Sequence, residues 1–459
     1  MQAFTNKIRP FGARDKLGYL LGNVANDLTF TFAGVFLLVF YTKVLGISPA
    51  AVGTLFLVAR FVDAFTDITM GRIADRAAST KNGKFRPWLL RMCAPVAIAS
   101  FLMYQSSIAS APLPLRLTYM TVTYLLWGSV FYTSINIPYG SMASVISPDP
   151  DHRASLSTAR SVGSVISNLA IGVIVPFFIY KTEGGSQTVS SAAFPVISGI
   201  LSVLAVVLYL LCYLMTKERV QVPRREHHSL RQTFSALITD RALIGIVIAS
   251  VFVLAAQLLS QSINQYLFID YFGDKRGVMI MTAAGIMPSL LLAPAAVPVS
   301  RRFGKKEVGT LGSLVASAAC LLLFLLRTRS MLVYILISLI GFLGFGIFNL
   351  IMWAFITDII DDREIRTGHR DDGTVYAIYS FARKVGQAIA GGLGGWTLAA
   401  IGFDETLQVQ TEAVRSGIYT VSTLLPAILY LAVALSLAFI YPLGKTRVEK
   451  NIAALKRKR

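Results

Sequence analysis

Long apolar stretches recur along the chain, and charged residues, glycine or proline bound each of them. A helix needs about 20 apolar residues to cross the hydrocarbon core of a bilayer. Windows of that kind predict twelve spans, near residues 17–42, 49–73, 88–108, 115–142, 156–180, 193–215, 242–269, 277–298, 307–326, 331–358, 374–402 and 413–441. The pattern therefore predicts an all-α membrane protein with twelve transmembrane helices in two six-helix pseudo-repeats.

The domain boundaries follow from the same pattern. We expect an N-terminal six-helix bundle over 1–215, a cytoplasmic linker over 216–241, a C-terminal six-helix bundle over 242–445 and a basic cytoplasmic tail over 446–459. One short motif repeats at the matching place in both bundles. Ala159-Arg-Ser-Val-Gly163 on span 5 recurs as Ala382-Arg-Lys-Val-Gly386 on span 11. Duplicated six-helix halves are typical of transporters that alternate access around a site at the middle of the membrane.

Composition and charge support this assignment. Of the 459 residues, 54% are hydrophobic and 15% charged, whereas an ordinary soluble domain carries about 25% charge. The formal net charge is +19, but 31 of the 43 Lys and Arg residues fall in segments that the topology places in the cytoplasm, and eight fall in the opposite loops. Basic residues collect in cytoplasmic loops. We therefore expect both termini in the cytoplasm, a lipid bilayer around the chain and no nucleic-acid partner.

Several kinds of chemistry find no support in the sequence. The three cysteines lie in apolar segments, and all four histidines, His152, His227, His228 and His369, fall in predicted cytoplasmic loops. This excludes a disulfide framework, an intramembrane histidine relay and a buried His-rich metal site. No GxxxxGKS or GxxxxGKT loop is present to hold the phosphates of ATP. We expect no cofactor, no cleaved signal peptide, and an ion gradient as the energy source.

Charged residues at membrane depth require an explanation, because each costs at least about 2.5–3.5 kcal/mol there. Span 2 carries Arg60, Asp63 and Asp67, which lie three and then four residues apart and so share one helical face. Two carboxylates and one guanidinium leave a net negative site. Such a site suits a proton, or a Na⁺ ion held with the help of Thr66 or Thr133. The alternative is a structural Arg–Asp pair, which would use only one of the two acids.

A second set of polar and aromatic residues suits a sugar pocket, in which aromatic faces stack on the ring and amides and acids read its hydroxyls. Amides and hydroxyls also bridge helices, Asp27 has the alternative of pairing with Arg160 or Lys384, and a tryptophan can belong to an interfacial belt. The candidates for substrate binding, taken from spans 1, 4, 5, 7 and 10, are Asn26, Asp27, Tyr132, Asn136, Arg160, Gln261, Asn264 and Trp353.

Lys384 on span 11 lies far from the cytoplasmic end of its span and needs an acidic partner. If it faces Asp63 and Asp67, the charge balance of the site changes when a cation binds, so we expect Lys384 to couple cation and cargo. Charged loops follow spans 2 and 10, the second being predicted over 358–373. Their alternatives are a solvated charge cluster and a gate of ion pairs that breaks as the halves move. We favour a gate that includes Asp75, Arg76, Asp358, Asp361 and Arg363.

Long motifs along almost the whole chain resemble one known family. They are GTLFLVARFVDAFTD, GRIADR and GKFRPW around span 2, NIPYGSMASVISPDP and HRASLSTAR at spans 4 and 5, and RTGHRDDGTVYAIYSFARKVGQAIAGG entering span 11. The sequence resembles the glycoside–pentoside–hexuronide:cation symporters of the major facilitator superfamily. Within that family, VAND, YTSINIPYGSMAS and FARKVGQAIAGG are most similar to the glucuronide carriers.

The resemblance implies roles for individual positions. In a member of the family that carries a disaccharide, acids matching Asp63 and Asp67 bind the coupling cation near residues that match Thr133 and Lys384. Its sugar is held by an acid that matches Asp27 and an arginine that matches Arg160. The chain departs from that member at several positions, which indicates a different sugar, an altered gate and H⁺ rather than Na⁺. These positions are Asn26, Thr66, Asn136, Gly140, Asp362 and Arg363.

Together these observations predict a monomeric carrier in the bacterial inner membrane. We expect it to import a glycoside, pentoside or hexuronide with H⁺, or with Na⁺, by alternating access. A lysolipid or amphiphile carrier of the same superfamily is the first alternative. A membrane enzyme, a sensor and a drug exporter are further alternatives. The sequence disfavours an enzyme because it lacks a nucleophile motif, and a sensor because it shows no appended soluble domain.

Overall fold

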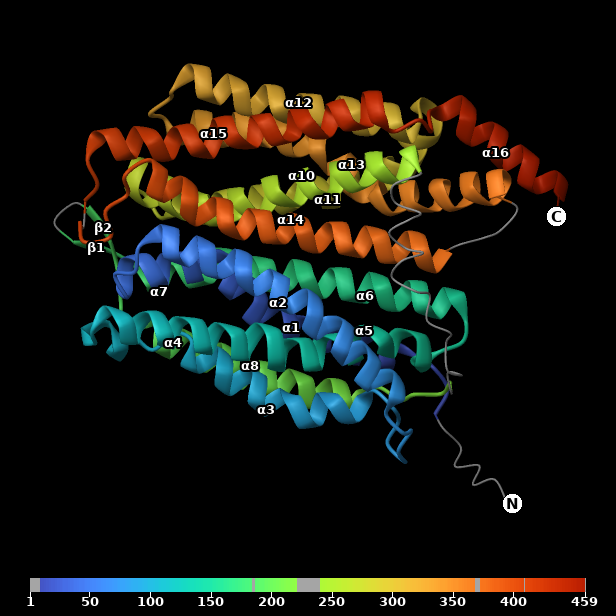
Figure 1. The fold of residues 1–459 in the computed structure, drawn as a ribbon, viewed down its shortest axis with the longest axis horizontal. Helices are drawn as coiled ribbons and strands as arrows, with labels where there is room; N and C mark the ends of the chain where they lie inside the picture. The colour runs from blue at the N-terminus through green and yellow to red at the C-terminus, as the bar shows by residue number, and fades with distance from the viewer. Residues whose placement is uncertain (1–8, 184–185, 221–239, 368–371, 408, 459) are drawn as a thin grey trace. The chain divides into compact units, whose positions relative to one another are not determined.

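The computed structural model describes residues 9–183, 186–220, 240–367, 372–407 and 409–458. The chain divides into two compact units, an N-terminal unit, Met1–Arg225, and a C-terminal unit, Glu226–Arg459. Almost all of the described chain is helical, as Figure 1 shows.

The helices of the N-terminal unit match the first six predicted spans, and several change to the wider π-helical winding along their length. Proline begins two of them. Pro49 follows Ser48, and Pro150 follows Asp149, whose side chain accepts a hydrogen bond from the backbone N–H of Asp151 at 2.8 Å. The six rods are α1 Ala13–Val39 with η1 Phe40–Val44; α2 Pro49–Arg76; α3 Arg86–Leu102; α4 Leu113–Leu125 with η3 Leu126–Tyr132 and α5 Thr133–Ile146; α6 Pro150–Leu169 with η4 Ala170–Ile174 and α7 Val175–Ile179; and α8 Ala193–Met215.

The C-terminal unit repeats this arrangement and adds one helix. Asp240 caps the first of its helices, since its carboxylate accepts hydrogen bonds from the backbone N–H groups of Ala242 and Leu243. The rods are α10 Arg241–Tyr266 with η5 Leu267–Tyr271; α11 Arg276–Phe303; α12 Lys305–Leu326; α13 Met331–Thr367; α14 Asp372–Ala400; and α15 Glu412–Leu435 with η6 Ser436–Ile440. A last helix, α16 Lys445–Lys458, follows them.

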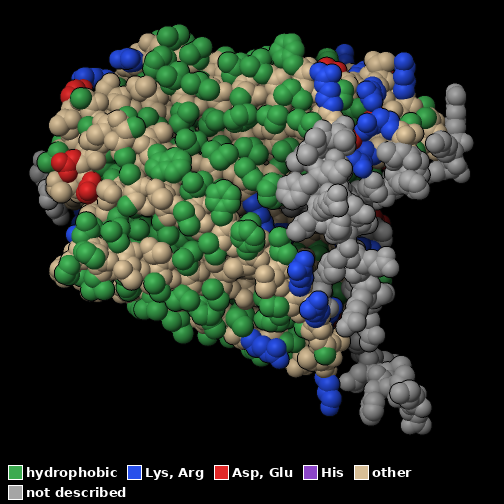
Figure 2. Space-filling model, viewed as in Figure 1, with side chains coloured by type: hydrophobic (Ala, Val, Ile, Leu, Met, Phe, Trp, Pro, Cys, Tyr) green, Lys and Arg blue, Asp and Glu red, His purple; other side chains and the backbone are tan. Residues whose placement is uncertain are grey.

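The prediction of an all-α membrane protein with twelve transmembrane helices is confirmed. Within the described residues, eight helices are long and apolar enough by themselves to cross a membrane. Large apolar side chains point outward along them; on α8, Val196, Ile200 and Val203 are 61, 62 and 67% exposed. Figure 2 shows hydrophobic side chains over the middle of the helices on the visible face of each unit, with Lys and Arg near their ends. Such a surface is stable in lipid rather than in water.

One local prediction was wrong, and two further elements had not been predicted. The segment predicted as a loop from 358 is helical up to Thr367, because acids and bases four residues apart form ion pairs along α13, as Asp362 and Arg366 do at 2.9 Å. The tail predicted over 446–459 is the helix α16. The loop between spans 5 and 6 contains a small antiparallel hairpin, β1 Tyr180–Glu183 and β2 Ser186–Val189.

The repeated motif packs in the same way in both units. A Cβ atom built on Gly163 of α6 would lie 2.9 Å from the carbonyl oxygen of Leu20 and 3.2 Å from the Cβ atom of Asn23, both on α1. A Cβ atom on Gly386 of α14 would lie 2.9 Å from the Val251 oxygen and 3.0 Å from the Leu254 Cβ atom on α10. Only glycine permits such close approach of two helices. The two contacts give a common register for comparing the halves.

Candidate functional site

Asp63, near the middle of α2, is held by two donors. The hydroxyl of Ser129 on η3 donates to its Oδ1 atom at 2.5 Å, and Nη1 of Arg60 lies 3.2 Å from its Oδ2 atom. The Asp63 side chain is 14% exposed. Gly128 leaves room beside it, since a Cβ atom there would lie 3.8 Å from Oδ1. The carboxylate is therefore largely buried and oriented by two donors, and a small part of it stays accessible.

Asp67, one turn further along α2, has a matching donor. The hydroxyl of Thr133, at the start of α5, lies 2.8 Å from its Oδ1 atom and 3.2 Å from the carbonyl oxygen of Gly128. Thr66 lies beside the pair, and its hydroxyl donates to the backbone oxygen of Asp63 at 3.1 Å. The structure thus brings Asp63, Asp67 and Thr133 together, with Thr66 turned toward its own helix.

The matching spacing of the two residue pairs explains how one helix serves both acids. Asp63 and Asp67 are four residues apart on α2, and Ser129 and Thr133 are four residues apart on the facing helix. Each hydroxyl meets one carboxylate. Ser129 lies in η3, a π-helical segment, and such segments are frequent at functional sites. Ser129 was missed because the sequence does not show which face of its helix contacts α2.

Aromatic rings surround the guanidinium of this site. The Cζ atom of Arg60 lies 5.6 Å from the ring centre of Phe30, and Phe30 stacks on Tyr132 at 5.5 Å. Tyr132 in turn contacts Trp127 at 5.4 Å. Tyr132, predicted to bind substrate, is therefore part of an aromatic group that adjoins the acidic pair.

A second polar cluster joins α1 to α6. The Oδ2 atom of Asp27 accepts hydrogen bonds from Ser164 at 2.5 Å and from Asn23 at 2.8 Å. Arg160 does not pair with Asp27 directly, because its Nε atom donates to the Oδ1 atom of Asn23 at 3.1 Å. Asn23 therefore bridges the acid and the base. The guanidinium of Arg160 also lies 5.7 Å from the ring centre of Tyr139.

The remaining candidates of the N-terminal unit are Asn26 and Asn136, which form no hydrogen bond with that cluster among the described residues. Asn26 is buried, and its Oδ1 atom accepts a hydrogen bond from the Tyr209 hydroxyl of α8 at 2.8 Å. Its amide nitrogen has no partner among the described residues. Asn136 is half-buried on α5. Asn26 thus contacts a neighbouring helix rather than the surroundings of Asp27.

In the C-terminal unit, Gln261 and Asn264 are half-buried on α10 and continue a stripe that begins at Gln257. Lys384 is half-buried on α14 and has interaction partners in the structure. The side chain of Trp353 lies outside the described part of the structure.

The candidate gate residues of the C-terminal unit have partners inside that unit. Lys305 pairs with Asp358 at 2.6 Å, and Nη1 of Arg363 lies 3.6 Å from the carboxylate of Asp240. These pairs tie α12, α13 and the start of α10 together. Asp361 is half-buried with its own interaction partners.

A neighbouring carboxylate joins the last helix to this network. Asp362 accepts from Arg447 of α16 at 3.0 Å, from Asn451 of α16 at 2.9 Å and from Arg366 at 2.9 Å. In the N-terminal unit, Arg76 is exposed, and the side chain of Asp75 lies outside the described part.

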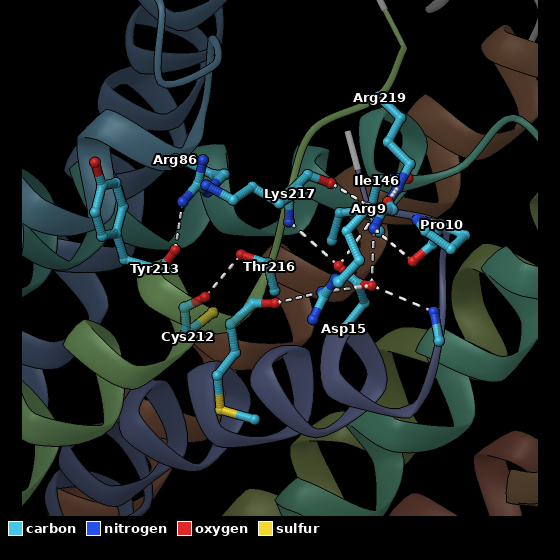
Figure 3. Close-up of polar contacts among 12 residues, drawn as sticks. Arg9, Pro10, Asp15, Arg86, Ile146, Cys212, Tyr213, Thr216, Lys217 and Arg219 are labelled. Atoms are coloured by element: carbon cyan, nitrogen blue, oxygen red, sulfur yellow. Dashed lines mark hydrogen bonds and ion pairs between the residues drawn. The ribbon is translucent and has the colours of Figure 1, made fainter. Parts of the chain in front are cut away.

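The sequence analysis missed a buried ion cluster in the N-terminal unit, which Figure 3 shows. Asp15 is fully buried, and Nη2 atoms of Arg9 and Arg219 lie 2.8 and 2.9 Å from its Oδ2 atom. Arg219 also donates to the carbonyl oxygen of Ile146 at the end of α5. The only signal in the sequence was one acid at the start of span 1. The cluster fastens the segment after α8 to the start of α1.

The same end of the unit is strongly positive. The charge of Arg86, together with burial and the charges of Arg9 and Arg14, lowers the pKa of Lys217 below its usual value. Glu218 partly balances this charge, because its carboxylate accepts the backbone N–H groups of Lys84, Phe85 and Arg86 at 2.7 to 2.8 Å. It thereby caps the start of α3.

Two helical units that share a packing motif, one of them with polar clusters along apolar helices, are typical of a membrane transporter. Comparison with known proteins gives the family: residues 18–445 match the model described as MFS/sugar transport protein. The chain belongs to this family, and the resemblance to the glycoside–pentoside–hexuronide:cation symporters is confirmed. The protein is a multi-pass membrane transporter.

Two relatives and one solved structure illustrate the similarity. The chain is 32% identical over 447 residues to the Glucuronide carrier protein homolog of Escherichia coli (strain K12), covering 96% of this chain and 95% of the relative. It is 30% identical over 434 residues to the Uncharacterized symporter YjmB of Bacillus subtilis (strain 168), with 94 and 92% covered. The crystal structure of a bacterial homolog to the human lysosomal transporter Spinster has a TM-score of 0.71 at 14% identity, with 97 and 99% covered. That structural likeness shows the fold alone.

Proposed function

We propose that the protein imports a sugar, namely a glycoside, pentoside or hexuronide, together with H⁺ across the bacterial cytoplasmic membrane, working as a monomer with both termini in the cytoplasm. The observation that carries the proposal is the acidic pair on α2. Asp63 and Asp67 each accept a hydrogen bond from a hydroxyl of the facing helix, and the guanidinium of Arg60 lies beside Asp63. Two acids and one base on this face of α2, at membrane depth, favour the uptake of a cation. The names of the relatives support a sugar as cargo.

The coupling follows from the charge of the site. A cation that binds at Asp63 and Asp67 from outside neutralises the surplus charge, which lowers the cost of moving the site through the membrane. The loaded carrier then exposes the site to the cytoplasm. The membrane potential supplies about 2.3 kcal/mol per charge per 100 mV. One cation per sugar is therefore sufficient for useful accumulation.

The cluster around Asp27 supplies groups for the cargo. Asp27 offers a carboxylate that accepts hydrogen bonds from sugar hydroxyls, and Arg160 offers further donors of its guanidinium. Tyr132 provides an aromatic face close to Arg60. In this proposal the amides of Gln261 and Asn264 bind hydroxyls from the C-terminal unit, and Lys384 responds to the charge of the cation site.

Na⁺ is the second candidate for the coupling cation. The groups around the acidic pair are all oxygens: the two carboxylates, the hydroxyls of Ser129 and Thr133 and the carbonyl of Gly128. Hard cations prefer such ligands. The experiment must therefore distinguish the two ions.

The test records external pH in a lightly buffered anaerobic suspension of cells that express the protein. Pulses of glucuronides, pentosides and galactosides are given with and without Na⁺. We expect alkalinisation with one class of sugar. Accumulation that depends on Na⁺ and causes no alkalinisation would replace H⁺ by Na⁺, and the absence of transport with every sugar would overturn the proposal.

Asp63→Asn provides the matching variant. We expect it to abolish uphill uptake while the protein remains in the membrane. Asp404→Asn is the control, because Asp404 lies in a loop of the C-terminal unit and its side chain bonds only to nearby groups of Thr406. Undiminished accumulation by Asp63→Asn would contradict the role of the acidic pair.

A further inference from the structure

Arg383 on α14 is a positive charge at membrane depth that the proposed mechanism does not use. Its helix begins at Asp372 and ends at Ala400, so Arg383 lies well inside the span. Its side chain is half-buried. Among the described residues it makes one contact, with the ring of Tyr379 on its own helix, whose centre lies 6.0 Å from the Cζ atom. No hydrogen bond or ion pair to another described residue neutralises it.

The glycine contacts show which residue of the N-terminal unit corresponds to Arg383. Gly386 packs on α10 as Gly163 packs on α1, against a backbone oxygen and the Cβ atom three residues later. Arg383 precedes Gly386 by three residues, as Arg160 precedes Gly163. The two arginines therefore occupy equivalent positions in the two repeats.

Their surroundings differ in one respect. Arg160 donates to Asn23, and Asn23 in turn donates to Asp27. In the common register, Leu254 stands where Asn23 stands in the first repeat, and Leu258 stands where Asp27 stands. The second repeat keeps the guanidinium and has apolar side chains in place of Asn23, its hydrogen-bond partner, and of Asp27, the acid that Asn23 contacts.

No acid among the described residues of the same unit forms an ion pair or hydrogen bond with Arg383. In the six predicted spans of the C-terminal unit, Asp and Glu occur only at two span ends, as Glu307 and Asp358, whereas the N-terminal spans contain three acids well inside. A guanidinium has five N–H donors, stays charged, and binds carboxylate or sulfonate oxygens in pairs. An arginine at membrane depth that pairs with no described carboxylate of its own unit is suited to an acid that arrives with the cargo.

We propose that Arg383 is the residue that binds the acidic group of the cargo, and that the protein therefore selects sugars with a carboxylate or sulfonate over neutral sugars. This inference rests on the proposed function, and it narrows that function to anionic sugars. Arg160 and Asp27 hold the ring hydroxyls in both cases.

The test compares three sugars with the same ring and the same aglycone: a glucoside, the corresponding glucuronide and the corresponding 6-sulfonate. Cells with wild-type protein, Arg383→Gln or Arg383→Lys are assayed for the KM of uptake, with the amount of protein in the membrane measured in each. We expect the wild type to prefer at least one of the acids to the glucoside. Arg383→Gln raises the KM of the preferred acid by about tenfold or more, the scale of one charge-assisted hydrogen bond, and leaves the KM of the glucoside unchanged. Arg383→Lys restores part of the preference because it keeps the charge.

Comparing the glucuronide with the 6-sulfonate identifies whether a carboxylate or a sulfonate is bound. Arg329→Gln is the control, since Arg329 belongs to the same unit but its side chain is 84% exposed. An equal loss for the acid and the glucoside, or no loss in Arg383→Gln, overturns the inference. Failure of the proposed function has a different signature, because then the wild type accumulates none of the three sugars.

Discussion

The hydroxyl of Ser129 lies 2.5 Å from Oδ1 of Asp63, and this contact has a counterpart one turn later between Thr133 and Asp67. Two equally spaced pairs lock η3 and α5 against α2. Each carboxylate has one oxygen directed by a neutral donor, and Asp63 also has the guanidinium of Arg60 beside it. The hydrogen bond from Ser129 therefore orients the carboxylate of Asp63, which pairs with Arg60 and is proposed to bind the cation.

The first prediction concerns Ser129→Ala. A hydrogen bond to a charged group contributes about 1.5–3 kcal/mol. Its loss leaves the Oδ1 atom of Asp63 without the donor that directs it, so the site holds the coupling cation less well. We expect the accumulation of sugar to fall by roughly tenfold at matched amounts of protein, the effect of about 1.4 kcal/mol. Sugar accumulation measured from pH 5 to 9 checks this.

Ser134→Ala is the control for that measurement. Ser134 lies on the same helix and donates to the backbone oxygen of Val130 at 2.6 Å, away from Asp63. Its pH profile should match the wild type. Identical profiles for Ser129→Ala and the wild type would show that the Ser129 contact does not act on the coupling step.

Contacts within one helix could be predicted from the sequence, whereas contacts between helices could not. Asp63 and Asp67 share a face because they belong to one helix, and their spacing of four is visible in the sequence. Ser129 and the bridging role of Asn23 depend on contacts between helices. Neither periodicity nor composition contains that information.

The charged segment after span 10 shows the opposite error. Alternating acids and bases at the end of α13 indicated a loop, yet the same residues form the i, i+4 pair of Asp362 and Arg366 and extend the helix. A mixed charge pattern is compatible with both a loop and an exposed helical turn. The deciding contacts, from Asp240 and from Arg447 of α16, come from distant parts of the chain.

The second prediction concerns Asn23→Leu. In the second repeat, the position equivalent to Asn23 is occupied by Leu254, so the variant copies that residue into the first repeat. Asn23 holds both Arg160 and Asp27, so its loss frees two groups of the proposed sugar site. We expect the KM for the sugar to rise by roughly tenfold, the effect of about 1.4 kcal/mol, with an unchanged dependence on pH. Uptake kinetics at several sugar concentrations check this.

An equivalent change far from the site serves as its control. Asn82 is exposed in the loop before α3, so Asn82→Leu should leave the sugar KM unaltered. If Asn23→Leu shifts the pH dependence but not the KM, the cluster belongs to coupling rather than to sugar binding.

The third prediction tests the helix contact that defines the repeat. A methyl group at position 386 would lie 2.9 Å from the backbone oxygen of Val251, so the two helices would have to move apart. Overpacking of this kind costs about 1–3 kcal/mol. Gly386→Ala should therefore lower the thermal midpoint of the purified protein in detergent. Gly71→Ala, where nothing lies within 4 Å of the added atom, should not lower it.

The fourth prediction concerns the attachment of α16. Asp362 is buried and accepts from Arg447 and Asn451 of that helix. Asp362→Asn removes the charge that balances Arg447 and Arg366, and breaking one side of a buried ion pair costs about 3–5 kcal/mol. We expect the amide hydrogens of Lys445–Lys458 to exchange faster in the variant, as hydrogen–deuterium exchange with mass spectrometry would record.

Glu449→Gln is the control, because Glu449 is exposed and lies 3.9 Å from Lys445 within the same helix. Unchanged exchange over α16 in Asp362→Asn would mean that apolar packing, for example of the buried Leu455, holds the helix by itself.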